Sequence, residues 1–166
     1  MTSDPSDIQV RMAEAKDIDI IAELNLAMAW ETEQKRLNPA TLKRGIRAVM
    51  DDSDFGFYVV AEAQSQIVGC LLVTHEWSDW RSGLFWWIQS LYVRPAFRRR
   101  GVFKRLHDFV KTQALDRPEV CGLRLYVEQS NHVAHQAYRR IGMTPRTYQI
   151  YEEMLTRPVA AQDDEG

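Results

Sequence analysis

The stretch FWWIQSLYVRPAFRRRGVFKRLHDFVKTQAL, residues 85–115, decides the fold class of this chain. It opens on an apolar, aromatic-rich run, residues 85–93, which predicts a β-strand, and Pro95 ends that strand because proline cannot donate to a ladder. A short basic turn, residues 98–101, comes next, and apolar residues then recur at helical spacing over residues 102–115. A strand, a basic glycine turn and a helix in this order place the amides of a helix N-terminus where an anion can bind.

Composition indicates one globular domain and excludes a general nucleic-acid-binding protein. The chain has 166 residues, of which 45% are hydrophobic and 27% charged, enough for one domain with a sizeable core. Its net charge of −2 leaves no overall basic surface. The basic cluster at residues 98–100 is local, and local charge indicates a local anion.

Neither the cysteines nor the histidines form a disulfide or metal pattern. Cys70 and Cys121 are too few for a disulfide framework and are not spaced as metal ligands. His132 and His135 are joined by no cysteine or carboxylate, so we expect no metal site. Residues 1–9 are polar and acidic, unlike a signal peptide, and no apolar run approaches the length of a membrane span. We therefore expect a cytoplasmic protein that binds neither a membrane nor nucleic acid.

Hydrophobic periodicity and turn residues divide the remaining chain into helices and strands. Asn38 before Pro39 predicts a helix cap, Asn131 predicts another, and Gly142 suits the position just after a helix. We find no repeat and no linker, so we expect a single domain over residues 1–155 and a disordered tail at 156–166. The expected elements are, in chain order, a strand at 8–12, a helix from Lys16, a helix from Pro39, a hairpin of strands 57–62 and 67–74 around the turn 63–66, a loop-like segment at 75–83, the strand and helix of residues 85–115, a strand at 123–128, a helix after Asn131, and a last strand at 147–155.

The basic turn resembles the coenzyme A signature of the GCN5-related N-acetyltransferases (GNAT). That signature is Arg or Gln, two residues, Gly, one residue, then Gly or Ala. Here it runs from Arg98 through Gly101 to Phe103, which departs from the small residue at the last position. The spacing from Asn131 to Tyr138 and the order of elements along almost the whole chain are also similar to the family. The resemblance implies an α/β fold with a central mixed sheet of six or seven strands flanked by about four helices.

The resemblance further implies acetyl-CoA, or coenzyme A, as co-substrate. The backbone amides of residues 99–103 would hold the diphosphate, Gly101 would allow close approach and a positive φ, and the arginines would add charge-assisted bonds. The pantetheine would enter between two splayed parallel strands and pair with the first of them. The expected cofactor-binding residues are Leu91, Tyr92, Val93, Arg98, Arg99, Arg100, Gly101, Val102, Phe103, Asn131 and Tyr138.

The resemblance also suggests the chemistry. A backbone N–H near Tyr92 or Val93, assigned to Val93, would stabilise the oxyanion as an amine attacks the thioester. Tyr138 would donate a proton to the leaving thiolate, since a thiol has a pKa of roughly 8.5 and a phenol one of about 10. Its position on an apolar helix stripe is equally typical of a core residue.

The general base is not identified by any motif. Many family members carry Glu on the central strand, whereas this chain has Gln89 and Ser90 there. We predict Glu31 as the base or as a contact to the acceptor. The other candidates that stay open are Glu33, His75, Glu76, Asp79 and Glu128.

Acidic and aromatic residues outside the motif suggest the acceptor. Glu31 and Glu33, together with Trp77, Trp80, Trp86 and Trp87, suggest a pocket for a cationic amine, although tryptophans can equally fill a core or a dimer interface. We predict an N-acetyltransferase that acts on a primary amine of a small molecule by direct attack, because neither cysteine lies in the matched motifs. A non-catalytic acyl-CoA-binding module and an RNA contact at residues 98–100 are the alternatives, and a homodimer is left open.

Overall fold

The structure, a computed structural model, describes residues 7–156 and divides into two compact units, Met1–Ser130 and Asn131–Gly166. The tail expected to be disordered lies outside the described residues from residue 157 onward, and so do residues 1–6. The single domain expected over residues 1–155 stays a prediction. Among the described helices, none combines the length and the apolar character that a bilayer span requires.

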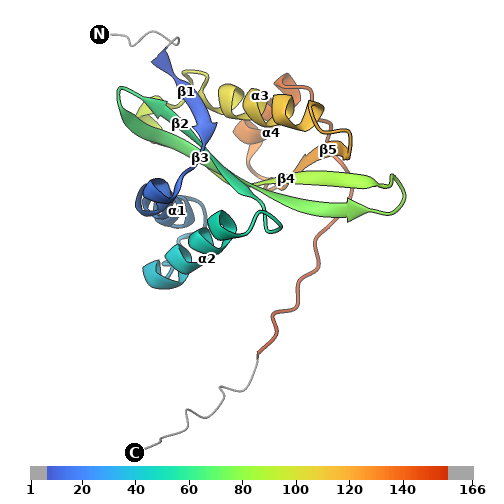
Figure 1. Ribbon diagram of the computed structural model, residues 1–166, viewed down its shortest axis with the longest axis horizontal. Coiled ribbons are helices and arrows are strands. Elements are labelled where there is room, and N and C mark those ends of the chain that lie inside the picture. The colour runs from blue at the N-terminus through green and yellow to red at the C-terminus, as the bar shows by residue number, and fades with distance from the viewer. Residues whose placement is uncertain (1–6, 157–166) are drawn as a thin grey trace, which may run out of the picture. The chain divides into compact units, whose positions relative to one another are not determined.

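The first unit is built on a five-stranded mixed sheet of order β1-β2-β3-β4-β5 (Figure 1). Neighbouring strands from β1 to β4 are antiparallel, whereas β4 and β5 run parallel. The mixed sheet is therefore confirmed, but the expected six or seven strands are wrong, since the described residues form five. The strands are β1 (Gln9–Met12), β2 (Phe57–Ala63), β3 (Gln66–Ser78), β4 (Gly83–Val93) and β5 (Val120–Leu125).

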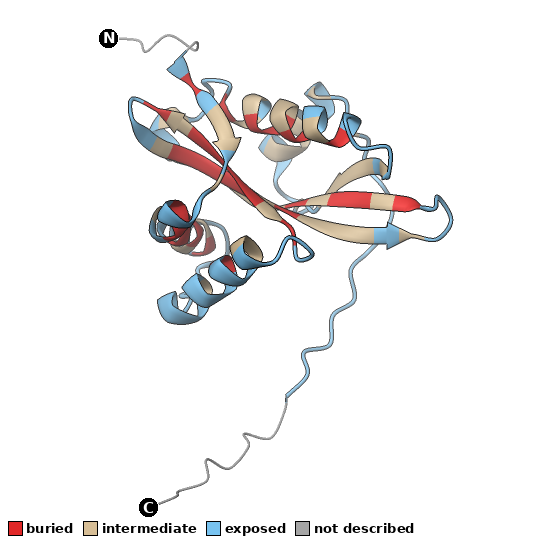
Figure 2. Cartoon of the chain, in the orientation of Figure 1, coloured by how far each residue is buried: buried red, intermediate tan, exposed pale blue. Residues whose placement is uncertain are grey.

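Helices cover both faces of this sheet because successive strand side chains point to opposite sides. The α1 face, named for α1 (Ile18–Glu33), also carries α2 (Pro39–Asp51). The α3 face carries α3 (Val102–Leu115), whose buried stripe includes Val102 and Leu106, so the helix predicted over residues 102–115 is confirmed. The most deeply buried residues run along the sheet and the inner sides of these helices (Figure 2). Strand residues on the α1 face include Tyr58, Val60, Cys70 and Tyr92, and those on the α3 face include Val59, Leu71, Val73, Trp86 and Ile88.

Local signals placed several boundaries correctly. Gln64 and Ser65 both have positive φ, 52° and 60°, which is the tight turn that the twist of a hairpin favours, so the predicted hairpin is confirmed. The Asn38 side chain accepts a hydrogen bond of 2.9 Å from the amide of Thr41, as expected of a cap before Pro39.

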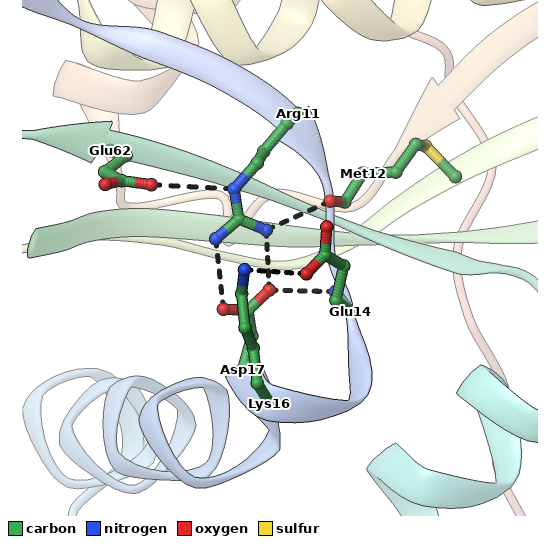
Figure 3. Close-up of polar contacts among 6 residues, drawn as sticks. All are labelled: Arg11, Met12, Glu14, Lys16, Asp17 and Glu62. Atoms are coloured by element: carbon green, nitrogen blue, oxygen red, sulfur yellow. Dashed lines mark hydrogen bonds and ion pairs between the residues drawn. The ribbon is translucent and has the colours of Figure 1, made fainter.

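An ion pair between the half-buried Arg11 and the buried Asp17 joins β1 to the start of α1 (Figure 3). Arg11 donates to both carboxylate oxygens of Asp17, at 2.7 and 3.1 Å, and the Glu14 amide donates to the same carboxylate at 2.8 Å. Burial alone would raise the pKa of Asp17, but these three donors outweigh it and lower that pKa. Asp17 lies in the short 3-10 helix η2 (Ala15–Asp17), so the pair fixes where α1 begins.

Two predicted boundaries around the central strand are wrong. The segment expected to be a loop at residues 75–83 continues β3 as far as Ser78, because its side chains pair across to β4, for example Glu76 with Phe85. Packing of such cross-strand pairs outweighs a polar composition. The strand expected at 123–128 instead spans Val120–Leu125, and Leu125 is its last residue paired with β4.

The second unit contains one helix, α4 (His132–Arg140), among its described residues. Asn131 caps it by accepting from the Ala134 amide at 3.1 Å. Gly142 follows it with φ 91° and donates to the Arg139 carbonyl, so both predicted helix ends are confirmed. The strand predicted at residues 147–155 is wrong: those residues form no strand, since alternation becomes a strand only where a neighbouring strand supplies backbone bonds.

Candidate active site

β4 loses its parallel neighbour half-way along its length. Pairing with β5 runs from Leu84 to Ile88, whose partner is Leu125, and no later pair is recorded in the part of the chain that the structure describes. Ser90 then adopts φ 49°, and the register against β3 shifts between Cys70 and Leu72. Such a bulge turns a strand and changes where its groups point. Residues 89–93, called the open edge below, therefore keep β3 on one side only.

The open edge directs the Val93 backbone away from β3. The Arg94 amide donates to the Val68 carbonyl at 2.8 Å, and Val93 lies opposite Gly69. In an antiparallel ladder this pattern makes Val93 the non-bonded member, so its N–H and C=O both point outward. Tyr92, one residue earlier, points its backbone groups toward β3. Of the two amides considered from the sequence, Val93 is the one on the open side.

The basic turn leads directly from this edge into α3. A short 3-10 helix, η3 (Pro95–Phe97), is followed by Arg99 at φ 59° and Gly101 at φ 82°. Gly101 is the residue before the first turn of α3 and has no side chain with which to cap it. Left-handed residues in such a turn bring successive N–H groups to one concave side, which suits an anion. Phe103 turns its ring toward His107, with 6.3 Å between ring centroids.

Arg98 is bound to protein groups through every nitrogen of its guanidinium. Its Nη1 and Nη2 contact Glu31 Oε1 and Oε2 at 2.6 and 3.0 Å, and its Nε donates to the Val93 carbonyl at 2.9 Å. The Tyr92 hydroxyl donates to Glu31 at 3.0 Å, and the guanidinium carbon lies 5.3 Å from the centre of the Tyr92 ring. Sequence analysis expected Arg98 to face a phosphate and Glu31 to face the acceptor; the structure pairs them with each other.

The pairing decides what Glu31 can do as an acid or base. The hydrogen bond from Arg98 is the largest influence on the pKa of Glu31 and lowers it. Burial opposes this effect, and the Tyr92 hydroxyl adds a further lowering, so the pKa is lowered on balance. Its carboxylate is thus ionised at neutral pH but is a weak proton acceptor.

The other carboxylates proposed as bases also have partners. Glu33 contacts Lys35 Nζ at 2.8 Å on the surface, and Asp79 accepts from the Trp80 amide at 2.9 Å in the β3–β4 turn. Glu128 accepts from the Ser130 hydroxyl at 3.0 Å.

His75 and Glu76 lie on opposite faces of the sheet. His75 lies on the α3 face, with its ring centroid 6.0 Å from that of Trp86. Glu76 lies on the α1 face, where it accepts from the Trp87 indole and, at 3.3 Å, from Arg124.

The four tryptophans do not gather into one pocket. Trp86 is 3% exposed and belongs to the core on the α3 face, because strand alternation separates it from Trp87. Trp77 and Trp80 are 60% and 89% exposed along the β3–β4 hairpin. Of these four tryptophans, only Trp87 lies on the α1 face, beside the point where β4 and β5 stop pairing.

Sequence reasoning missed two residues next to Trp87. Tyr126 stacks on Trp87 with ring centroids 4.3 Å apart, and the Arg124 guanidinium lies 3.6 Å from the Phe85 ring centre. Gly122 makes room for this packing, since a Cβ there would lie 2.7 Å from the Phe85 ring. The alternation of Arg124 and Tyr126 with the half-buried Leu123 and Leu125 was a signal that could have found them.

Comparison with known proteins identifies the family. The model of the Acetyltransferase (GNAT) family matches residues 21–143, which is most of the chain. The chain belongs to the GNAT family. The resemblance seen in the basic turn is thereby confirmed, and the protein is an acetyltransferase-family enzyme.

Solved structures agree with this assignment. This GNAT chain is 37% identical to a possible acetyltransferase from Clostridium difficile 630, with a TM-score of 0.83 over 90% of this chain and 99% of that one. A predicted acetyltransferase with acetyl-CoA from Clostridium acetobutylicum shares the fold at 16% identity, with a TM-score of 0.72 over 88% and 96%. Aminoglycoside N-acetyltransferase AAC(6')-Iy in complex with CoA shares it at 14% identity, with a TM-score of 0.72 over 89% and 94%. The search of curated proteins found no match.

The remaining predicted residues of this GNAT enzyme lie in the unit Asn131–Gly166. Asn131 caps α4, and Tyr138 follows seven residues later in the same helix. Desolvation raises the pKa of the Tyr138 phenol, so the group stays protonated at neutral pH, as a proton donor must. Both are placed within their own unit, and their roles toward a cofactor stay predictions.

The cysteines of this GNAT enzyme differ in environment. Cys70 is buried on the α1 face, and burial raises the pKa of its thiol to about 12. A thiol with that pKa is not ionised at neutral pH and is a poor nucleophile. Cys121 is exposed on β5.

Proposed function

We propose that this GNAT enzyme transfers the acetyl group of acetyl-CoA to a primary amine of a small molecule. The observation that carries the proposal is the continuity of the open edge of β4 with the basic turn. Val93 offers an outward backbone N–H, and the left-handed Arg99 and Gly101 precede the amides that begin α3. One ligand with a thioester at one end and a diphosphate at the other fits both features.

The proposed reaction is direct attack. The unprotonated amine nitrogen bonds to the thioester carbon, the Val93 N–H stabilises the resulting oxyanion, and the C–S bond then breaks. Tyr138 gives its proton to the leaving thiolate and is reprotonated from water. The buried, unionised Cys70 supports a route without an acyl-enzyme. Because only the free amine attacks, we expect kcat/KM to rise with pH through the acceptor's own pKa.

The acceptor class rests on two supports. Trp87 and Tyr126 present a stacked aromatic surface on the α1 face, suited to a small molecule with apolar or cationic parts. Two distant structural neighbours are described as aminoglycoside acetyltransferases. Polyamines, amino acids and aminoglycosides therefore form the first panel of acceptors.

The test compares Tyr138→Phe with Tyr151→Phe, a matched control whose side chain is 92% exposed. Thiol release from acetyl-CoA is measured over the amine panel, and CoA affinity is measured by calorimetry. Loss of a general acid lowers kcat by roughly 100-fold. We expect that loss in Tyr138→Phe alone, with CoA affinity unchanged in both variants. Equal kcat values for the two variants would remove Tyr138 from the mechanism.

A non-catalytic acyl-CoA-binding module is the second candidate. It is favoured by Gln89, which stands where many relatives carry a base and donates to the Thr74 hydroxyl at 2.6 Å. CoA binding by the parent chain without turnover of any amine would support this candidate over the transferase.

A further inference from the structure

The Val93–Arg94 peptide is held by hydrogen bonds on both of its sides. Its N–H donates to the Val68 carbonyl of β3 at 2.8 Å, and its C=O accepts from Arg98 Nε at 2.9 Å. The first bond belongs to the sheet. The second comes from a side chain that must itself be oriented, because an arginine has several rotatable bonds.

Glu31 supplies that orientation from the last turn of α1. Both of its oxygens contact the Arg98 guanidinium, at 2.6 and 3.0 Å, in a two-point geometry that fixes direction as well as distance. The Tyr92 hydroxyl donates to Glu31 at 3.0 Å, and the Tyr92 ring lies under the guanidinium. Glu31, Tyr92 and Arg98 form one assembly, called the clasp below, that ends on the Val93 carbonyl.

We propose that Glu31 and Arg98 are positioning residues that hold Val93 for acetyl transfer, rather than a base and a phosphate ligand. This inference rests on the proposed function. Three of the five N–H donors of Arg98 already contact Glu31 and Val93, so a phosphate would meet at most the remaining N–H on Nη1 and on Nη2. The turn carries Arg99 and Arg100 beside it, so the charge opposite a diphosphate does not depend on Arg98.

The clasp also specifies how an extended ligand pairs with the open edge. The Val93 carbonyl already accepts one hydrogen bond from Arg98, whereas the Val93 N–H points outward, so the open edge offers an incoming chain chiefly a donor. A thioester carbonyl, which only accepts, matches that donor, whereas an amide N–H of the ligand would have to share the Val93 carbonyl with Arg98.

The kinetic test uses Glu31→Gln, Arg98→Ala and the double variant. The control is Glu23→Gln, which breaks another ion pair between α1 and the end of β4, from Glu23 to Arg94 at 2.9 Å. Misplacing a reacting group by about 1 Å costs up to about 100-fold in rate. We expect each single variant to lower kcat by about 10- to 100-fold, the double variant to be no slower than Arg98→Ala, and the control to keep the parent rate.

CoA affinity, measured by calorimetry, separates the two roles of Arg98. We expect the dissociation constant to change less than threefold in Glu31→Gln and Arg98→Ala, because the clasp positions Val93 and leaves the phosphates to the turn. A tenfold weaker affinity in Arg98→Ala, with parent affinity in Glu31→Gln, would overturn the proposal and make Arg98 a phosphate ligand.

A structural readout keeps the clasp testable if the parent shows no turnover. The Arg98 Nε–H resonance, identified in a ¹⁵N spectrum by its absence from Arg98→Lys, should shift in Glu31→Gln and Tyr92→Phe and stay in place in Glu23→Gln. An Arg98 resonance indifferent to Glu31→Gln refutes the clasp itself. Absence of turnover together with this pattern refutes the transferase function and leaves the clasp standing.

Discussion

Replacing Gly101 with alanine tests whether the basic turn needs its left-handed residue. Gly101 has φ 82°, and a Cβ built there meets no atom within 4 Å, so the substitution costs strain and no collision. A left-handed conformation costs an L-residue about 1–2 kcal/mol. Alanine recovers about 0.4–1 kcal/mol by restricting the unfolded chain. We therefore expect Gly101→Ala to lower the free energy of unfolding by about 0.5–1 kcal/mol.

Gly45→Ala is the matched control. Gly45 lies inside α2, and its added Cβ also meets nothing within 4 Å, but its φ is helical. Alanine is favoured over glycine there by roughly 0.5–1 kcal/mol, so the two variants should differ by about 1.5 kcal/mol. Urea unfolding followed by tryptophan fluorescence measures both, with the slope of the transition confirming comparable unfolded states.

Binding supplies the second half of this test. If the strained turn relaxes, the first amides of α3 change direction and the affinity for CoA falls, by about tenfold for a loss of 1.4 kcal/mol. Gly45→Ala should bind CoA as the parent does. Should Gly101→Ala match Gly45→Ala in both stability and affinity, the turn does not depend on the left-handed glycine and the reasoning about the anion site is wrong.

Two further predictions concern stability. Asp17→Asn should destabilise the chain by roughly 2–3 kcal/mol at neutral pH, since it leaves Arg11 without its buried partner. Because the folded-state pKa of Asp17 is lowered, the parent should keep this stabilisation above the unfolded pKa of about 3.9 and lose it as the pH falls further. A pH series of unfolding free energies in which parent and variant differ equally at pH 7 and pH 2 would contradict this assignment. Gly56→Ala should lower the melting temperature by about 10 °C, because a Cβ there would lie 1.9 Å from the Val73 carbonyl oxygen and the backbone φ is 136°. A melting temperature within about 2 °C of the parent value would show that the start of β2 accommodates the methyl group without cost.

Much of the fold follows from local chemistry that the sequence displays. The cap at Asn38, the hairpin turn at Gln64 and Ser65, and the helix end at Gly142 are each determined by residues within one turn of one another. The strand expected at residues 147–155 failed for the opposite reason. Apolar and polar residues do alternate there, but a strand forms only beside another strand, and the local sequence does not show whether such a neighbour is present.

The candidate active site likewise contains features that local sequence predicts and features that depend on distant contacts. The shape of the basic glycine turn was predictable because it depends on the positive φ that Gly101 makes possible. The ion pair between Glu31 and Arg98 was not predictable, since the two residues lie far apart in the chain and meet only when α1 packs on the sheet.

The sequence by itself determined the order of elements up to α4, the caps, the left-handed glycine turn and the family, because each depends on residue type at short spacing. The tertiary structure alone decided that Val93 faces outward beyond the last β4–β5 pair at Ile88. It also decided that Trp86 and Trp87 lie on opposite faces of the sheet, and which carboxylate meets which guanidinium. Those outcomes depend on strand register and helix packing, and they are set by free energies summed over many distant contacts.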